Sequence, residues 1–192
     1  MMRDLVISLR STMVLWVLTA ALYPLLILGI GQGFFPYQAN GSLLTNAQGQ
    51  VVGSALIGQR FQGDGYFWGR PSTVNYSEGE EAAPTGISGA SNLAPSNPDL
   101  RQRIEAEIQR LKAAGVTPPG DLVYSSGSGL DPQISVAAAQ AQIQRIAKVR
   151  GVTPEVLATL IAQHTEHRFL GIFGEPGVNV LKLNLALDQR SQ

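Results

Sequence analysis

The sequence predicts an α+β protein in which a single N-terminal transmembrane helix precedes one soluble domain of about three helices and several short strands. Two observations lead to this fold class. An uncharged apolar run occupies residues 11–30, and the rest of the chain alternates stretches of helical periodicity with short apolar stretches bounded by glycine and proline. We therefore divide the chain into a cytoplasmic N-terminus at 1–10, a membrane anchor at 11–33 and an extracytoplasmic domain at 34–192.

The apolar run STMVLWVLTAALYPLLILGI is long enough to cross a bilayer. Its twenty residues, at about 1.5 Å each in a helix, reach about 30 Å, the thickness of the hydrocarbon core. A cleaved signal peptide would have a shorter apolar core and a small-residue cleavage site, whereas GQGFFPYQ follows here. A buried core helix, the other alternative, is rarely apolar on every face. Pro24 is compatible with an anchor because kinked helices are tolerated in membranes.

The basic residues on either side of the anchor predict its orientation. Arg3 and Arg10 lie just before it, and the next Lys or Arg along the chain is Arg60. Because cytoplasmic flanks are enriched in basic residues, we expect the N-terminus in the cytoplasm and the domain outside.

The composition excludes several classes of function. The chain has 14 acidic and 14 basic residues, which does not favour nucleic acid as a partner. It has no cysteine, which excludes structural disulfides, thiolate catalysis and cysteine–zinc sites. We therefore expect the domain to be stabilised by packing or by partner proteins.

The first part of the domain predicts a hairpin and an aromatic loop. Leu43–Leu44 and Val51–Val52 flank the turn-rich sequence NAQGQ, as in a β-hairpin. The loop FQGDGYFWGRPS at 61–72 allows two interpretations. Its rings either pack into the core, or the loop is an exposed recognition element with Trp68 and Arg70 as anchors.

A long polar stretch then leads into the first helix. Residues 75–98 are rich in Gly, Ser, Asn and Pro, and such long connections tend to be functional or disordered. Asn97 can cap a helix whose first residue is Pro98, and the helix is expected to run to about Ala114. Residues 122–124 then predict a short strand.

The glycine-rich loop SSGSGLDPQIS at 125–135 lacks the lysine of a phosphate-binding loop, so we interpret it as a turn. Ser135 is expected to cap a second helix that ends near Arg150, and Thr153 to cap a third. The alternating apolar residues of 178–187 predict a strand with a bulge near 180–181.

The sequence HTEHR at 164–168 invites a metal-binding or acid–base interpretation. Two histidines without cysteine do not complete a zinc site, and histidines are also favourable at a helix C-terminus, so we favour a structural role. No GxSxG, HExxH or P-loop motif is present, and the conspicuous polar residues lie in loops. This favours binding over catalysis. An anchored hydrolase that uses His164 and Glu166, and a freestanding binding module, remain the alternatives.

Five motifs carry a resemblance to a known family: GYFWGRPS (65–72), SGASNLAPSNP (88–98), SGSGLDPQIS (126–135), HTE (164–166) and GEPGVNVLKLNLAL (174–187). With a single N-terminal anchor and this order of motifs, the chain resembles the C subunits of bacterial Kdp potassium-transporting P-type ATPases, the KdpC family. The resemblance covers essentially the whole chain. It departs at Ala90, where the family often has glycine, and at Gly177, where a larger residue is common.

The resemblance implies a non-catalytic accessory subunit in the bacterial inner membrane, needed for assembly and activity of the complex. The implied partners are a potassium-channel-like subunit, a P-type ATP-hydrolysing subunit and a small single-span subunit. Potassium is the transported ion, and the family is described as a catalytic chaperone that raises the ATP affinity of the hydrolysing subunit. A domain outside the membrane cannot touch cytoplasmic ATP, so we expect no directly bound cofactor and an effect that acts at a distance. We also expect the domain to cap the outer mouth of the channel-like subunit.

The resemblance also indicates which residues meet the partners. In the anchor, four residues recur at helical spacing and would either pack against partner helices or face lipid: Thr12, Trp16, Thr19 and Tyr23. In the domain, the motif loops supply the candidates for subunit interfaces: Gly69, Arg70, Pro71, Ser72, Asn92, Ser96, Asn97, Gly129, Asp131, His164 and Glu166.

Overall fold

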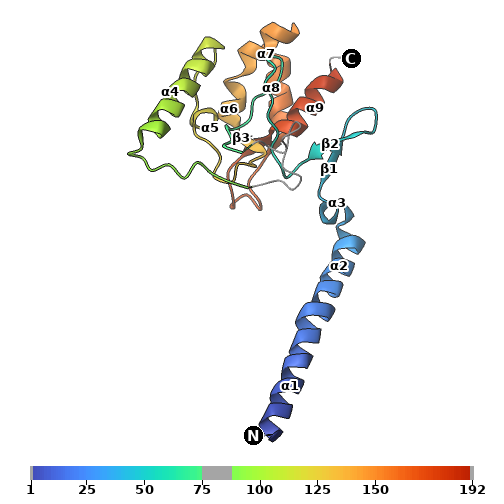
Figure 1. Cartoon of the computed structure of the whole chain (residues 1–192). Coiled ribbons are helices and arrows are strands. Elements are labelled where there is room, and N and C mark those ends of the chain that lie inside the picture. Colours follow the sequence, from blue (N-terminus) through green and yellow to red (C-terminus); the bar gives the residue numbers. More distant parts are fainter. Residues whose placement is uncertain (1, 75–87, 191–192) are drawn as a thin grey trace. The chain divides into compact units, whose positions relative to one another are not determined.

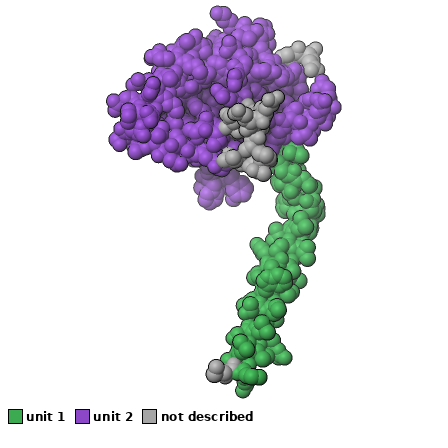
Figure 2. Space-filling view, in the orientation of Figure 1, with its two compact units in different colours: residues 1–43 green, residues 44–192 purple. Residues whose placement is uncertain are grey.

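The computed structural model describes residues 2–74 and 88–190, and it divides into two compact units (Figures 1 and 2). Unit 1 comprises Met1–Leu43 and unit 2 comprises Leu44–Gln192. The long apolar helix and the mixed domain that follows it confirm the predicted α+β class with a single candidate span among the described residues.

Unit 1 is built on one continuous helix, which is long and apolar enough to cross a membrane by its length and composition. It consists of α1 (Met2–Trp16), a π-helical segment η1 (Val17–Leu22) and α2 (Tyr23–Phe34), and the short helix α3 (Pro36–Ala39) follows. The helix begins at Met2, nine residues before the predicted anchor. The π-helical segment ends two residues before Pro24, which has no N–H to donate to the preceding turn. The wider turn therefore lies where the α-helical hydrogen bonding is interrupted.

Two small antiparallel arrangements of strands are present, and all their residues except Leu43 belong to unit 2. The predicted hairpin is confirmed: β1 (Leu43–Thr45) pairs with β2 (Val51–Ser54), and the Asn46 side chain accepts hydrogen bonds from the turn amides of Gln48 and Gln50. The second sheet has the order β3-β5-β4, formed by β3 (Gln133–Ser135), β5 (Gly177–Asn179) and β4 (Thr165–Glu166). Both outer strands pair antiparallel with β5, so Val178 lies opposite Ile134 on one side and Thr165 on the other.

The predicted first helix is confirmed as α4 (Pro98–Ala113), and Asn97 caps it by accepting a hydrogen bond from the Asp99 amide at 2.8 Å. The predicted second helix is interrupted, and forms α6 (Val136–Gln140) and α7 (Ile143–Arg150). Ser135 caps α6 through the Ala138 amide, as expected. The predicted third helix is α8 (Pro154–Gln163), although the hydroxyl of Thr153 makes no cap hydrogen bond.

The predicted strand over 178–187 is wrong. Only β5 is extended, and α9 (Val180–Arg190) follows it directly (Figure 1). The predicted bulge at 180–181 is therefore also wrong. Asn179 caps α9 by accepting a hydrogen bond from the Lys182 amide, and the buried positions 180, 183, 184 and 187 follow the period of a helix. Leucine is a good helix former, so the alternation of leucines did not distinguish the two structures.

The predicted strand at 122–124 is also wrong, because residues 120–123 form one helical turn, α5 (Gly120–Val123). Leu122 and Val123 are both buried, whereas successive side chains of a strand point to opposite faces. The core of unit 2 lies between α4–α9 and the three-stranded sheet. Its largest fully buried apolar side chains are Phe67, Leu111, Leu122, Ile146, Leu157, Leu160, Ile161 and Leu183.

Candidate partner-binding surface

The aromatic loop at 61–72 is held from inside the domain by two buried amide side chains. Asn184 on α9 donates to the Phe67 carbonyl at 3.0 Å and accepts from the Phe67 amide at 2.9 Å. Gln142, between α6 and α7, makes the same pair of bonds to the next residue, Trp68, at 3.1 and 2.8 Å. The two side-chain amides thus make the hydrogen bonds that a neighbouring strand would make in a sheet. The buried N–H and C=O groups of Phe67 and Trp68 therefore have partners although the loop is not part of a sheet.

The rings of this loop belong to the core. Phe67 and Trp68 are 0% and 5% exposed, so the interpretation of Trp68 as an anchor of an exposed recognition loop is wrong. Two guanidinium groups lie over the Trp68 ring: those of Arg145 and Arg110, at 3.6 and 4.2 Å from its centroid. Burial lowers the pKa of Arg145 to about 10, while the charge of Asp64 acts in the opposite direction and that of Arg110 in the same one.

Arg70 lies near the end of the aromatic loop and links it to two other segments. Its guanidinium pairs with the Asp121 carboxylate on α5 at 2.6 Å, and the other carboxylate oxygen accepts the Ser135 amide at 2.7 Å. Burial raises the pKa of Asp121, but the hydrogen bonds from Ser135 and the charge of Arg70 together outweigh burial and hold this pKa below its ordinary value. Asp121 therefore fixes the relative positions of the loop, α5 and the start of α6.

Three loops meet beside this ion pair, and we call this region the three-loop junction (residues 71–74, 88–89 and 126–131). The Ser72 hydroxyl lies 2.8 Å from the Gly129 carbonyl, the Ser126 amide donates to the Pro71 carbonyl, and the Gly89 amide donates to the Ser128 carbonyl. Hydrogen bonds between backbone and hydroxyl groups thus join segments from three of the family motifs into one surface.

Gly129 is the point of closest approach in this junction. Its φ is +73°, and a Cβ there would lie 2.5 Å from Val74 Cγ2 and 2.6 Å from the Gly89 carbonyl oxygen. Only glycine fits both the backbone conformation and the space. Asp131, three residues after Ser128, lies at hydrogen-bond distance from the hydroxyl of that serine, at 3.3 Å.

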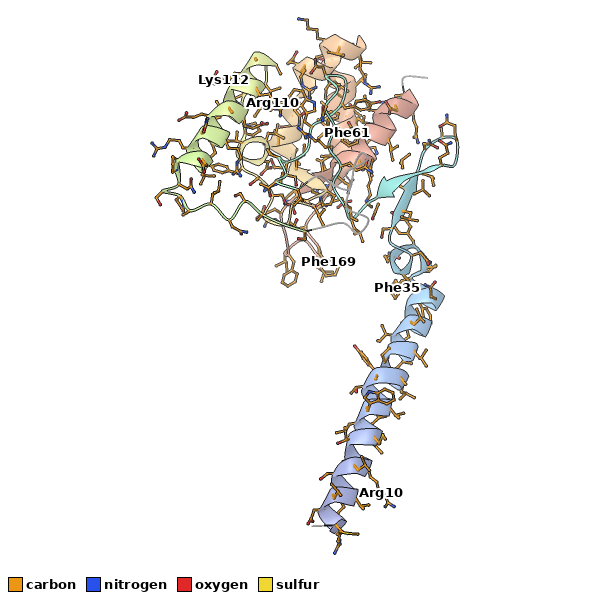
Figure 3. All side chains as sticks on the ribbon, in the orientation of Figure 1. Arg10, Phe35, Phe61, Arg110, Lys112 and Phe169 are labelled. Atoms are coloured by element: carbon orange, nitrogen blue, oxygen red, sulfur yellow. The ribbon has the colours of Figure 1, made fainter. Side chains whose placement is uncertain are left out.

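A cleft of about 470 Å³ runs between the aromatic loop and α4. Figure 3 labels Phe61 and Arg110, which line it from the loop and from the helix. The four predicted residues Gly69–Ser72 lie along its wall, and its charged lining comprises four arginines and one glutamate: Arg60, Arg70, Arg103, Arg110 and Glu107. The cleft is therefore basic and suits a partner segment that carries acidic or carbonyl oxygens.

The other predicted interface residues do not join this surface. Asn92 and Ser96 are exposed, and Asn92 has a positive φ of 50°. Asn97 is used as the cap of α4. Residues 75–87 of the long polar stretch lie outside the described residues. In the anchor helix, the Thr19 hydroxyl donates to the Leu15 carbonyl at 2.7 Å.

The side chains of His164 and Glu166 contact different groups. His164 Nδ1 lies 2.9 Å from the Leu160 carbonyl at the end of α8. Glu166 accepts from Gln133 on β3 and from Lys182 on α9, and so ties strand β4 to both of these elements. Among the described residues, no group of three or more His, Cys, Asp or Glu side chains could hold a metal ion.

Sequence reasoning missed several residues on which the surface depends. Asp121, Gln142 and Asn184 each hold a segment more than 50 positions away in the chain, and nothing in their immediate sequence predicts this. The exposed apolar run FLGIF at 169–173 was also missed, although four large apolar side chains within five residues are a visible signal.

Together these features define a class of protein: a mixed α+β domain whose motif loops are joined by hydrogen bonds, preceded by one helix long and apolar enough to span a membrane. The profile of the family described as "KdpC: K+-transporting ATPase, c chain" matches residues 5–189, so the chain belongs to the KdpC family.

Curated relatives agree with this assignment. A potassium-transporting ATPase KdpC subunit of Synechocystis sp. (strain ATCC 27184 / PCC 6803 / Kazusa) is 70% identical over 99% of this chain and 100% of the relative. The subunit of the same name from Anabaena sp. (strain L31) is 55% identical over 98% of this chain and 94% of the relative. The one from Geobacter sulfurreducens is 47% identical over 97% of this chain and 98% of the relative.

Proposed function

We propose that this chain is a non-catalytic accessory subunit of a potassium-transporting P-type ATPase, held in the bacterial inner membrane by the helix Met2–Phe34. The observation that carries the proposal is the family match over residues 5–189, with relatives named as KdpC subunits of potassium-transporting ATPases over nearly their whole length. The site geometry supports it: the polar residues of the motif loops hold one another in place, which builds a rigid surface for a partner.

The proposed partners are the potassium-channel-like subunit, the P-type ATP-hydrolysing subunit and a small single-span subunit. The basic cleft and the three-loop junction form the proposed contact surface of the domain, and Thr12, Trp16, Thr19 and Tyr23 that of the anchor. The positive-inside distribution of Arg3 and Arg10 supports a domain outside the membrane, where it can cap the outer mouth of the channel-like subunit.

An outside domain raises the ATP affinity of the hydrolysing subunit only through coupling between states of the membrane subunits. No ATP contact by this chain is then required. Potassium is the ion that the complex transports, and this chain holds neither potassium nor a cofactor in this proposal.

The test is potassium-stimulated ATP hydrolysis by the membrane complex, with and without this chain, over a range of ATP concentrations. If the complex dissociates without the chain, its role is assembly. If the complex persists and needs more ATP for the same rate, the long-distance coupling is supported. A complex that keeps its composition, its maximal rate and its ATP dependence would refute both roles.

The alternative of an anchored hydrolase has a separate test. We expect the purified full chain to show no turnover of ester or peptide substrates, because Glu166 is engaged by Gln133 and Lys182 and His164 by a backbone carbonyl. Turnover that is abolished by His164→Ala would favour the hydrolase.

A further inference from the structure

One apolar segment of unit 2 is displayed to solvent. Phe169, Leu170, Ile172 and Phe173 are 71%, 73%, 71% and 62% exposed, and together with Gly171 they form one continuous run. Figure 3 shows Phe169 at the end of a loop that projects from the domain. The other large exposed apolar side chains described in unit 2 occur singly or in pairs. A contiguous patch of this kind marks an interaction site.

The run forms a small closed hairpin, which we call the apolar tip (residues 169–173). Phe169 and Phe173 exchange both backbone hydrogen bonds, at 2.8 and 3.0 Å. The turn amides are satisfied as well, since Gly171 donates to the Arg168 carbonyl and Ile172 to the Phe169 carbonyl. Four of the five backbone donors of the tip therefore have partners within residues 168–173, which lowers the cost of moving the tip out of water.

The turn holds a strained backbone conformation at the same residues whose apolar side chains are exposed. Leu170 has a φ of +53° and Gly171 one of +73°. A leucine in the left-handed region is uncommon and costs free energy, and such strain collects at functional segments. The side chain that bears this cost is also the most exposed of the tip.

A charged pair marks the base of the tip. Arg168 donates to both carboxylate oxygens of Glu175 at 2.9 Å, and both side chains remain accessible to solvent. The two or three residues beyond this pair extend about 7–10 Å at the usual rise of a strand. That length matches the depth, about 5–10 Å, to which apolar groups enter the headgroup and acyl boundary of a bilayer.

The chain keeps the domain close to such a surface. If helix Met2–Phe34 spans the membrane, residues 35–43 alone connect it to unit 2. Nine residues reach at most about 30 Å even when fully extended. The effective concentration of lipid around the tip is therefore high, so even a weak affinity for the interface leads to occupancy.

We propose that the apolar tip inserts into the lipid–water interface of the bilayer in which this chain is anchored, as a second attachment point for the domain. This rests on the proposed membrane anchor. A lipid interface suits the tip better than a protein partner does, because its side chains offer no hydrogen-bonding group that would orient a partner. The paired charges at its base are neutral overall, so insertion does not depend on anionic lipid.

The experiment uses the full chain, without partner subunits, in phosphatidylcholine vesicles whose acyl chains carry bromine near the interface. In a Trp16→Phe background, Phe169→Trp adds one tryptophan at the tip, and Tyr124→Trp adds one at an exposed position elsewhere as the matched control. We expect the emission added by Phe169→Trp to fall roughly twofold in brominated vesicles, since the ring would lie at interfacial depth. The emission added by Tyr124→Trp should not change.

The unmodified chain distinguishes failure of this proposal from failure of the anchor. Quenching of Trp16 with no quenching at position 169 would overturn the tip proposal and leave the anchor intact. Absence of Trp16 quenching would overturn both the proposed membrane anchor and the tip proposal that rests on it. The emission of Phe169→Trp could instead shift to the blue only when the partner subunits are present and show no quenching by bromine. This outcome would place the tip on a protein and would also overturn the proposal.

Discussion

The side chain of Asn184 bonds both backbone groups of Phe67, 117 positions earlier in the chain, with N···O distances of 2.9 and 3.0 Å. Phe67 is fully buried and Asn184 is 1% exposed, so neither backbone group of Phe67 can turn to water instead. The motif at 65–72 is therefore tied to the last helix through one buried amide.

The first prediction concerns that amide. Asn184→Leu keeps the approximate size of the side chain but leaves a buried N–H and a buried C=O of Phe67 without partners. Each unsatisfied group costs about 1–3 kcal/mol, so we expect the free energy of unfolding to fall by about 2–5 kcal/mol. Denaturant unfolding of the full chain in detergent, followed by tryptophan fluorescence, measures it. Gln144→Leu, an exposed amide on α7, is the control and should change stability by less than about 0.5 kcal/mol.

The second prediction concerns the three-loop junction. Gly129→Ala places a Cβ where Val74 and the Gly89 carbonyl already lie, in a left-handed backbone conformation. We expect a loss of about 2–4 kcal/mol, because strain and overpacking add. Gly127→Ala is a matched control, since a Cβ at Gly127 has no neighbour within 4 Å. Equal unfolding midpoints for the two variants would contradict the described packing.

The third prediction is a pH dependence. The pKa of Asp121 is lower in the folded protein than its ordinary value of 3.8, so its interactions stabilise the fold at pH values above 3.8. This stability is lost as the pH falls through the lowered pKa. Asp121→Asn should therefore cost about 1 kcal/mol at pH 7, and the difference from the unmodified chain should shrink in strong acid. The free energies of unfolding of Asp121→Asn and of the unmodified chain, measured at pH 7 and at decreasing pH below 4, check this prediction. If the difference between the two proteins grows in acid, the prediction is wrong.

The fourth prediction concerns the anchor. Replacing Thr12 and Thr19 together by leucine should reduce recovery of the intact complex in detergent, because small side chains permit close helix packing. The control pair is Val14→Leu and Val17→Leu, which add bulk on another side of the helix. Unchanged recovery with both pairs would mean that the threonine side faces lipid.

The fifth prediction tests orientation. With the domain outside, protease added to inside-out vesicles should leave residues 44–192 intact until detergent is added. The same protease should cleave this region in right-side-out preparations. Digestion in sealed inside-out vesicles would place the domain in the cytoplasm, and direct contact with ATP would then become possible.

Local signals in the sequence were sufficient for part of this structure. The apolar run, the hairpin turn, and the caps Asn97 and Ser135 were predicted, because each depends on interactions within a few residues. Family membership was likewise predicted from motifs that are contiguous in the chain. The two strands that were predicted wrongly lie in segments whose local signals are short or ambiguous. Leu122 lies in a helical turn of four residues, and the leucines of α9 fit a period of two as well as a helix.

The tertiary structure alone decided what the motifs do. It buried Trp68 under Arg145, paired Arg70 with Asp121 and placed Gly129 against Gly89. It also left the tip at 169–173 outside the core, although its composition would suit the interior. Periodicity and capping report only on neighbours along the chain. Four of the hydrogen bonds that hold the candidate surface join residues 51 to 117 positions apart, and their partners are chosen by packing of the whole domain.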